Sequence, residues 1–221
     1  MTSDSLTLEV DSTLLSTSRT TLKPYAIVDG IPTFRDSQLI HLFEKARDER
    51  LLPLVMYNVE PETPASAFVR MFRVGSGRML FLVLNEGQLA GWVWLDDIAN
   101  RTARSHFCFF RWVSRAKLSE SIGRKMFWEL FNLKFRNGVK LQVIRAEMPA
   151  FNKPGLWFLK KMGMKEIGEI PDGAYRFATG RFCPMIYLYA TRDMLKWREL
   201  ERAGDRAPAL PSPAQSSHPY D

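Results

Sequence analysis

The alternation of hydrophobic and polar residues divides the middle of the chain into helices and strands. Apolar residues spaced three and four positions apart form a stripe in three segments, as in helices that pack on a core. A fourth, shorter helix is expected before Gly163, and Asn137-Gly138 is expected to end the longest one as a left-handed cap. The helices are predicted at Asp36–Arg50, Thr63–Val74, Ser119–Arg136 and Lys153–Met162.

Short apolar runs bounded by turn residues predict the strands. Arg78–Leu84 and Leu89–Leu95 flank the turn Asn85-Glu86-Gly87-Gln88 and are expected to form a hairpin. The order of elements predicts a mixed α/β fold with an antiparallel front half and a strand–helix–strand unit in the middle. The strands are predicted at Pro24–Asp29, Arg78–Leu84, Leu89–Leu95, Ser105–Val113, Lys140–Glu147, Met164–Ile170 and Met185–Ala190.

The two ends of the chain differ from this middle region. Residues 1–21 are rich in Ser and Thr and are expected to form a flexible arm, and residues 203–221 are rich in Pro, Ser and Ala and are expected to be disordered. The folded domain is therefore predicted over residues 22–200. The N-terminus lacks an apolar block behind a basic start, and no apolar run is long enough to span a membrane, which predicts a cytoplasmic protein.

Composition changes this picture only slightly. The net charge of +7 favours anionic partners, but the basic residues are spread along the chain, so nucleic acid is a weakly supported partner. Cys108 and Cys183 lie in apolar segments without metal-ligand spacing and are interpreted as small buried hydrophobic residues. The aromatic residues of Ser105–Val113 and of the following helix are interpreted as core rather than as a base-stacking platform.

The segment Val113–Gly123 joins a predicted strand to the longest predicted helix. A helix N-terminus presents unpaired backbone N–H groups and a positive dipole end, which bind phosphate oxygens. Arg115, Lys117, Arg124 and Lys125 add positive charge nearby. The alternative interpretation is a helix start capped by serine, with no ligand.

This segment resembles the acyl-CoA pyrophosphate loop of the GNAT family of N-acyltransferases, V-x-P-x-x-[QR]-G-x-G-[IV]-[GA]. Val113, Ile122 and Gly123 match the pattern, whereas Leu118 replaces Gln or Arg. Serines replace two glycines, which leaves phosphate less free to approach the backbone. The residues that the resemblance assigns to the cofactor, here and in the next motif, are Trp112, Val113, Ser114, Leu118, Ser119, Ser121, Ile122, Gly123, Arg124, Asn152 and Lys160.

The segment Asn152–Met164 resembles a second GNAT motif, N-x-x-[AS]-[IL]-x-[LF]-Y-x-x-x-G-[FM]. In that family this helix flanks the bound CoA. Gly155 stands where the family has a small residue, and Leu159 stands where the family has a proton-donating tyrosine. The residues that match the pattern are Asn152, Leu156, Phe158, Gly163 and Met164.

Together the two motifs imply the GNAT fold, a mostly antiparallel sheet of six to seven strands flanked by helices. In that fold the sheet is splayed between its fourth and fifth strands, where the pantetheine and thioester bind. The resemblance implies acetyl-CoA or another acyl-CoA as co-substrate and a small-molecule or protein amine as acceptor. It is closest to GNAT-like proteins of tailed phages, which would place the protein in the host cytoplasm or the virion.

The resemblance also suggests catalytic residues. In this family a carboxylate on the fourth or fifth strand often acts as base, and Glu147 is the first candidate, followed by Asp96, Asp97 and His106. The last three are interpreted mainly as solvated groups at strand ends. Leucine cannot donate a proton, so the acid is expected to be a tyrosine, Tyr187 first and Tyr175 or Tyr189 as alternatives.

Three functions remain open at this point. The first is an N-acyltransferase that works by direct attack of the amine on the thioester. The second is a catalytically degenerate GNAT-fold protein with a structural role, suggested by Leu159 and the replaced glycines. The third is a nucleic-acid-modifying enzyme on the same fold. Arg111 is predicted to be either exposed or in the acceptor groove, and neither the acceptor nor the oligomeric state is indicated.

Overall fold

The computed structural model describes residues 19–194, apart from residues 30, 61, 74, 75, 136, 137 and 139. The predicted C-terminal tail, nearly all of the N-terminal arm and Asn137 lie outside the described residues. Among the described residues, no helix has the length and apolar character needed to cross a membrane.

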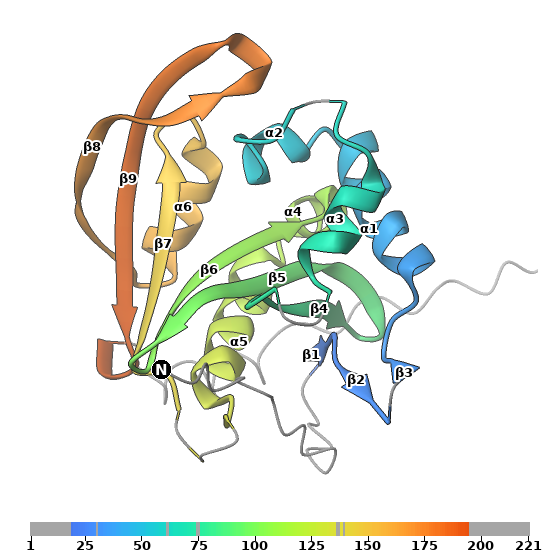
Figure 1. The fold of residues 1–221 in the computed structure, drawn as a ribbon. Helices are drawn as coiled ribbons and strands as arrows, with labels where there is room; N and C mark the ends of the chain where they lie inside the picture. The colour runs from blue at the N-terminus through green and yellow to red at the C-terminus, as the bar shows by residue number, and fades with distance from the viewer. Residues whose placement is uncertain are drawn as a thin grey trace, which may run out of the picture.

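A seven-stranded sheet in the order β1-β4-β5-β6-β7-β9-β8 forms the centre of the fold (Figure 1). Every neighbouring pair is antiparallel except β6 and β7, which run parallel. This confirms the predicted fold class. The strands are β1 (Thr20–Pro24), β4 (Met79–Asn85), β5 (Gln88–Ala99), β6 (Thr102–Phe109), β7 (Val143–Pro149), β8 (Lys165–Arg176) and β9 (Arg181–Thr191).

Each face of the sheet carries its own hydrophobic core. Alternate residues of β4 point to opposite faces, so Leu80 and Leu82 join one core and Phe81 and Val83 the other. The first core packs under α1 and α3, and the second under α5 and α6. The helices are α1 (Asp36–Asp48), α2 (Leu52–Val55), α3 (Ala65–Met71), α4 (Arg111–Arg115), α5 (Ser119–Asn132) and α6 (Lys153–Lys161).

The predicted strand Ser105–Val113 is wrong in its second half, because β6 ends at Phe109 and α4 begins at Arg111. The Phe110 N–H bonds the Ala90 carbonyl, and the chain then leaves the sheet. The Arg111 side chain is exposed and donates from Nε to the Glu49 carbonyl at 2.7 Å. Arg111 therefore anchors the end of α1 on the surface.

Other boundaries also differ from the prediction. The first strand of the sheet is Thr20–Pro24 rather than Pro24–Asp29, and Ile27–Val28 pairs instead with Ile31–Pro32 in the small β2–β3 hairpin. α5 ends at Asn132, so the left-handed Gly138, with φ of +70°, belongs to a separate turn. The last two strands are longer than predicted and form a hairpin that turns at Phe177–Thr179.

Candidate active site

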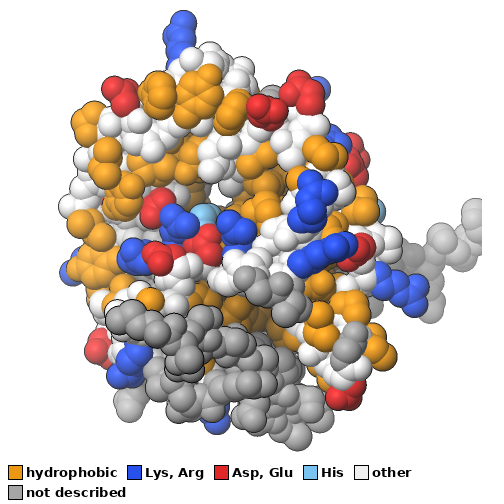
Figure 2. Space-filling model, viewed as in Figure 1, with side chains coloured by type: hydrophobic (Ala, Val, Ile, Leu, Met, Phe, Trp, Pro, Cys, Tyr) orange, Lys and Arg blue, Asp and Glu red, His pale blue; other side chains and the backbone are white. Residues whose placement is uncertain are grey.

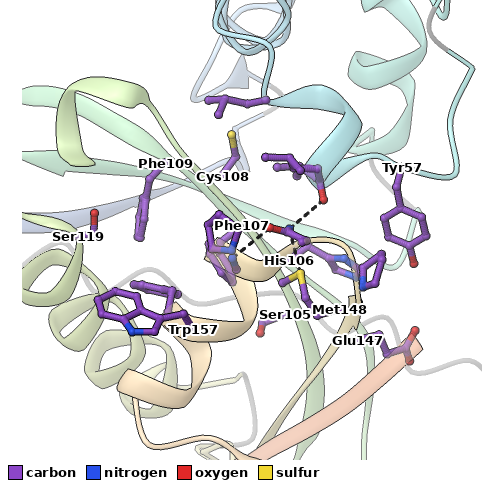
Figure 3. Close-up of a pocket in the computed structure, with 18 of the residues that line it drawn as sticks. Tyr57, Ser105, His106, Phe107, Cys108, Phe109, Ser119, Glu147, Met148 and Trp157 are labelled. Carbon is purple, nitrogen blue, oxygen red and sulfur yellow. Dashed lines mark hydrogen bonds between the residues drawn. The ribbon is translucent and has the colours of Figure 1, made fainter. Parts of the chain in front are cut away.

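The sheet opens between β6 and β7, as the resemblance implies. The two strands pair only from Thr102↔Val143 to Arg104↔Arg145. The Ser105 hydroxyl then bonds the Arg145 carbonyl at 3.3 Å, and beyond it the β6 edge that faces β7 has no strand partner among the described residues. A cavity of about 300 Å³ occupies this opening and is bounded by β6, β7, α2 and α6 (Figure 3). We call it the first cavity.

The first cavity is mostly apolar and has two different ends. Ser119, Phe109 and Trp157 lie at one end, and Tyr57 and Glu147 lie at the other (Figure 3). Its aromatic wall is rigid because three phenylalanine rings pack together. Its lining consists of Leu51, Leu54, Val55, Tyr57, Ser105, His106, Phe107, Cys108, Phe109, Ser114, Ser119, Glu147, Met148, Pro149, Asn152, Pro154, Gly155, Trp157 and Phe158.

The Ser119 end of the cavity is the N-terminus of α5. A tight turn precedes it, with Lys117 at φ +57° and the Leu118 N–H bonded to the Val113 carbonyl. In the first turn of any α-helix the N–H groups have no acceptor within the helix, and they form its positive end. Ser114 and Ser119 place their hydroxyls 3.5 Å apart beside this end. The site is therefore suited to an anionic group.

Asn152 holds three walls of the cavity together. Its Oδ1 accepts from the Gly155 N–H at 3.0 Å, which caps α6. Its Nδ2 donates to the Leu54 carbonyl at 3.2 Å and contacts the Met148 sulfur at 3.0 Å. The side chain is buried and satisfied, so it positions α2, β7 and α6 relative to one another.

The structure brings Ser114, Ser119 and Asn152 of the predicted cofactor residues to the cavity wall. The other side chains are engaged elsewhere. Val113 and Ile122 are fully buried in the core, Gly123 packs under Phe158, and Leu118 lies against the same core. Trp112 Nε1 bonds the Leu89 carbonyl, Ser121 Oγ bonds the Leu118 carbonyl, Arg124 pairs with Glu120, and Lys160 pairs with Glu166.

The Glu147 end of the cavity continues into a charged network. Arg104 Nη1 donates to Glu147 Oε2 at 2.9 Å, and Arg104 Nε donates to Asp96 Oδ1 at 2.7 Å. His106 Nε2 lies 3.3 Å from Asp96 Oδ1, and the His106 ring stacks on Trp94 with centroids 4.5 Å apart. Acidic and basic side chains accordingly cluster beside a hollow in the face shown in Figure 2.

Asp96 anchors this network. Burial opposes its ionisation, but hydrogen bonds from His106 and Arg104 outweigh burial and hold the pKa of the Asp96 carboxyl well below its usual range. The hydrogen bond to Asp96 in turn raises the pKa of Arg104. Asp96 is therefore a buried group within β5 that is ionised at neutral pH, and its interpretation as a solvated strand-end group is wrong.

The remaining base candidates occupy different settings. Asp97 is exposed and pairs with Arg145 at 2.5 Å, away from the cavity lining. His106 lies in the middle of β6 and lines the cavity, with its ring held between Trp94 and Asp96. Glu147 is thus the carboxylate that the structure places at the first cavity.

The tyrosines near Glu147 include one that sequence analysis missed. Tyr187 pairs with Glu147 across β7 and β9, and Tyr189 pairs with Arg145. Tyr175 lies out on the β8–β9 hairpin beside Phe182. Tyr57 lines the cavity, and burial, aided by the charge of Glu147, raises the pKa of Tyr57 to about 12. It lies after α2 in a segment without a periodic pattern, so no local signal indicated it.

Leu159 and the two cysteines settle smaller points. Leu159 is fully buried in the core and does not reach the cavity lining. Cys108 is buried as predicted, and burial raises the pKa of its thiol, whereas Cys183 is half-buried. Within the described ranges, no group of His, Cys, Asp and Glu is arranged to hold a metal ion.

Comparison with solved structures identifies the fold. The spermidine N-acetyltransferase from Vibrio cholerae, solved with CoA and spermine, superposes with a TM-score of 0.61 at 14% identity, covering 80% of this chain and 97% of that one. The ribosomal-protein-S5-alanine acetyltransferase from Vibrio fischeri superposes with a TM-score of 0.55 at 13% identity, covering 82% of this chain and 97% of that one. The microcin C7 self-immunity acetyltransferase MccE, solved with acetyl-CoA and AMP, superposes with a TM-score of 0.56 at 12% identity, covering 78% of this chain and 92% of that one.

These neighbours are GNAT acetyltransferases, and the chain has the GNAT fold that they share. No protein-family model and no curated protein sequence matches the chain.

Proposed function

We propose that the chain is an N-acyltransferase that moves an acetyl group from acetyl-CoA to an amine. The observation that supports this most directly is the open first cavity, with a helix N-terminus at one end and Glu147 at the other. Two of the neighbouring acetyltransferases were solved with CoA or acetyl-CoA. The acceptor differs among them and does not follow from the fold.

The first step is binding of the cofactor. Its pyrophosphate lies at the N-terminus of α5, where backbone N–H groups and the Ser114 and Ser119 hydroxyls face the cavity. Its pantetheine arm follows the unpaired β6 edge past Phe107 and Phe109. Backbone N–H groups of β6 polarise the thioester carbonyl.

The second step is direct attack by the acceptor amine on the thioester carbonyl carbon. A C–N bond forms and the C–S bond breaks, while Glu147 takes the proton that the amine loses. The thiolate leaves and receives a proton from Tyr57 or Tyr187, which lie beside Glu147, and the proton held by Glu147 then restores the tyrosine hydroxyl. Because a thiol has a pKa near ~8.5, the thiolate is a good leaving group even without a strong acid.

Ser119→Glu tests the cofactor site. A carboxylate in the first turn stabilises a helix, so we expect the fold to be retained. The new carboxylate would occupy the proposed pyrophosphate position and repel the negatively charged pyrophosphate. We expect acetyl-CoA binding, measured by calorimetry, to weaken about 10-fold or more, which is ~1.4 kcal/mol. Ser66→Glu makes the same charge change in the first turn of α3 and should leave binding unchanged. Equal binding by the two variants would contradict the site.

A second candidate function is a GNAT-fold structural protein without catalysis. The buried Leu159, which cannot act as the usual acid, favours it. It would agree with the resemblance to phage-carried proteins and with a place in a virion. Measured transfer of acetyl groups that disappears in Glu147→Gln would exclude it, whereas cofactor binding without transfer to a broad panel of amines would support it.

A further inference from the structure

The short helix α2 separates the first cavity from a second one. Leu51, Leu54 and Val55 line the first cavity, whereas Leu52 and Met56 line the second. The second cavity also measures about 300 Å³ and is lined by Phe43, Arg47, Arg50, Leu52, Pro53, Met56, Tyr57, Val59, Glu60, Arg176 and Ala178. Tyr57 lines both cavities and is the residue that their linings share.

The turn of the β8–β9 hairpin closes the second cavity. The Phe177 N–H bonds the Tyr57 carbonyl at 3.3 Å, which joins the hairpin to the segment after α2. Arg176 at the end of β8 and Ala178 in the turn line this cavity together with Phe43 of α1. In Figure 1 the hairpin rises above the sheet and its turn bends toward α2. The second cavity is therefore built from α1, the hairpin and the side of α2 that faces away from the first cavity, and Tyr57 is the residue that the two linings share.

The charges around the second cavity are mainly positive. Arg47 is paired with Glu44 at 2.8 Å, and Glu60 is the one acid in the described lining. Among the described residues, Arg50 and Arg176 form no ion pair. The Arg176 guanidinium lies over the Phe151 ring at 4.4 Å, and its buried Nε lacks a hydrogen-bond partner within the described part of the chain. Two guanidinium groups thus remain available beside an apolar chamber.

This chemistry selects among amines. An apolar body gains free energy when Phe43, Leu52 and Met56 remove it from water. A guanidinium binds a carboxylate or phosphate oxygen with charge-assisted hydrogen bonds. A polyamine would bring further positive charge toward Arg50 and Arg176, where like charges repel.

We infer that the second cavity holds the body of the acceptor, and that the acceptor is an amine with an apolar body and an oxyanion group. The inference rests on the proposed acetyl transfer. The oxyanion binds Arg176 and Arg50, the apolar body fills the chamber, and the amine passes Tyr57 to reach Glu147. This assigns Arg176 to acceptor specificity rather than to the reaction itself.

The test uses the full chain, acetyl-CoA and four amines: the dipeptide Leu-Leu, its C-terminal amide, O-phosphoethanolamine and spermidine. Release of the CoA thiol measures the transfer. We expect kcat/KM to be about 10-fold higher for Leu-Leu than for its amide, mainly through KM, because only the acid pairs with the guanidinium groups. Transfer to the phosphate without transfer to Leu-Leu would assign the site to phosphates. Preference for spermidine over both anions would overturn the inference.

Arg176→Met should greatly reduce the preference for Leu-Leu over its amide, because the carboxylate then keeps only Arg50 as a guanidinium partner. Arg176→Lys keeps the charge and should restore part of the preference. Arg181→Met is the matched control, because Arg181 is exposed on the same hairpin and lines neither described cavity. An unchanged acid-to-amide ratio in Arg176→Met would overturn the inference.

Equilibrium binding separates this inference from the proposed function. N-acetyl-Leu-Leu and its amide are titrated calorimetrically into wild type and Arg176→Met, which are first matched by thermal unfolding. Tighter binding of the acid by wild type alone supports the second cavity even if no acetyl transfer is found. Equal binding of acid and amide, with acetyl transfer intact, overturns the second cavity and leaves the proposed function standing.

Discussion

Glu147 and Tyr57 lie at the same end of the first cavity, and each contributes something that the other cannot (Figure 3). Glu147 accepts a hydrogen bond from Arg104 through Oε2, which fixes the carboxylate at the cavity wall. Tyr57 is partly withdrawn from water, and the raised pKa keeps its hydroxyl protonated well above neutral pH. A hydrogen-bond donor beside a carboxylate is the arrangement needed to stabilise a departing thiolate while an amine loses its proton.

Removing either group should slow transfer without preventing acetyl-CoA binding. For Glu147→Gln and Tyr57→Phe we expect kcat to fall by roughly 10²–10⁴-fold, the range of acid–base assistance. The matched variant Tyr187→Phe should have a smaller effect, because Tyr57 lines the cavity and Tyr187 lies on the neighbouring strand. A larger loss in Tyr187→Phe would assign the proton donor to Tyr187 instead.

The ionisation of Tyr57 can be measured separately from activity. In a spectrophotometric titration, the tyrosine that disappears in Tyr57→Phe should be one that ionises at about pH 12. Since the folded protein holds this proton more tightly than the unfolded chain, its contribution to stability is complete below about pH 10 and is lost as pH rises toward 12. If the tyrosine signal lost in Tyr57→Phe were one that ionises near pH 10, this would contradict the burial of the Tyr57 hydroxyl.

Asp96→Asn tests the charged network. The folded state lowers the pKa of Asp96, so the stability gained from its ionised form is present above the unfolded value near ~3.9 and is lost as pH falls below it. At neutral pH we expect a loss of roughly 1–3 kcal/mol in unfolding free energy, less than for a fully buried pair. Chemical denaturation should show this difference shrinking below about pH 4. A constant difference would contradict the assignment.

At the level of elements, the aromatic wall of the first cavity depends on how closely α5 and α6 pack against each other. Gly123 of α5 lies directly under Phe158 of α6, and a Cβ added there would lie 2.4 Å from the Phe158 Cζ. Phe158 also contacts Phe107 and Phe109, so it links the helix packing to the aromatic wall of the first cavity. The glycine that matches the family loop therefore serves packing between helices in this chain.

Gly123→Ala should push Phe158 out of place. We expect a loss of about 1–3 kcal/mol in unfolding free energy, the usual cost of overpacking a core, together with weaker acetyl-CoA binding. Gly168→Ala is the matched control, because no described atom lies within 4 Å of the place on β8 where its methyl group would sit, and it should change stability by less than about 0.5 kcal/mol. Unchanged stability in Gly123→Ala would show that Phe158 relaxes freely.

At the level of the whole molecule, the opening between β6 and β7 joins two layers that otherwise have separate cores. The first cavity lies between α6 and α2, which belong to opposite faces of the sheet. A ligand in this opening contacts both layers and should tie them together.

Acetyl-CoA should therefore raise the unfolding temperature, by an amount that grows with the logarithm of its excess over Kd. Mass action predicts about 2.7 kcal/mol of added stability at a 100-fold excess. Differential scanning calorimetry with CoA, acetyl-CoA and AMP compares how much the pantetheine arm and the nucleotide each raise the unfolding temperature. The exposed Trp157 at the cavity rim offers a fluorescence signal for the same titration. No shift at millimolar acetyl-CoA would contradict the proposed function.

The local sequence was enough to predict those helices and strands whose hydrophobic residues recur at a regular spacing. The stripes of α1 and α5, the turn between β4 and β5, and the Asn152 start of α6 were all predicted within a few residues, because periodicity and capping are local properties. The fold class followed from their order. Glu147 was predicted at the site because it ends a predicted strand on which the family resemblance implies a carboxylate base.

Which distant residues meet was set by tertiary packing alone. The Arg104 bridge between Asp96 and Glu147, the place of Tyr57 in the linings of both cavities, and the closure of the second cavity by Arg176 all join residues far apart in the chain. The turn of Arg111–Arg115 away from the sheet was missed because contacts with Ala90 and Glu49 override its strand-like pattern. Local pattern carries no information about such contacts, since packing between layers selects them.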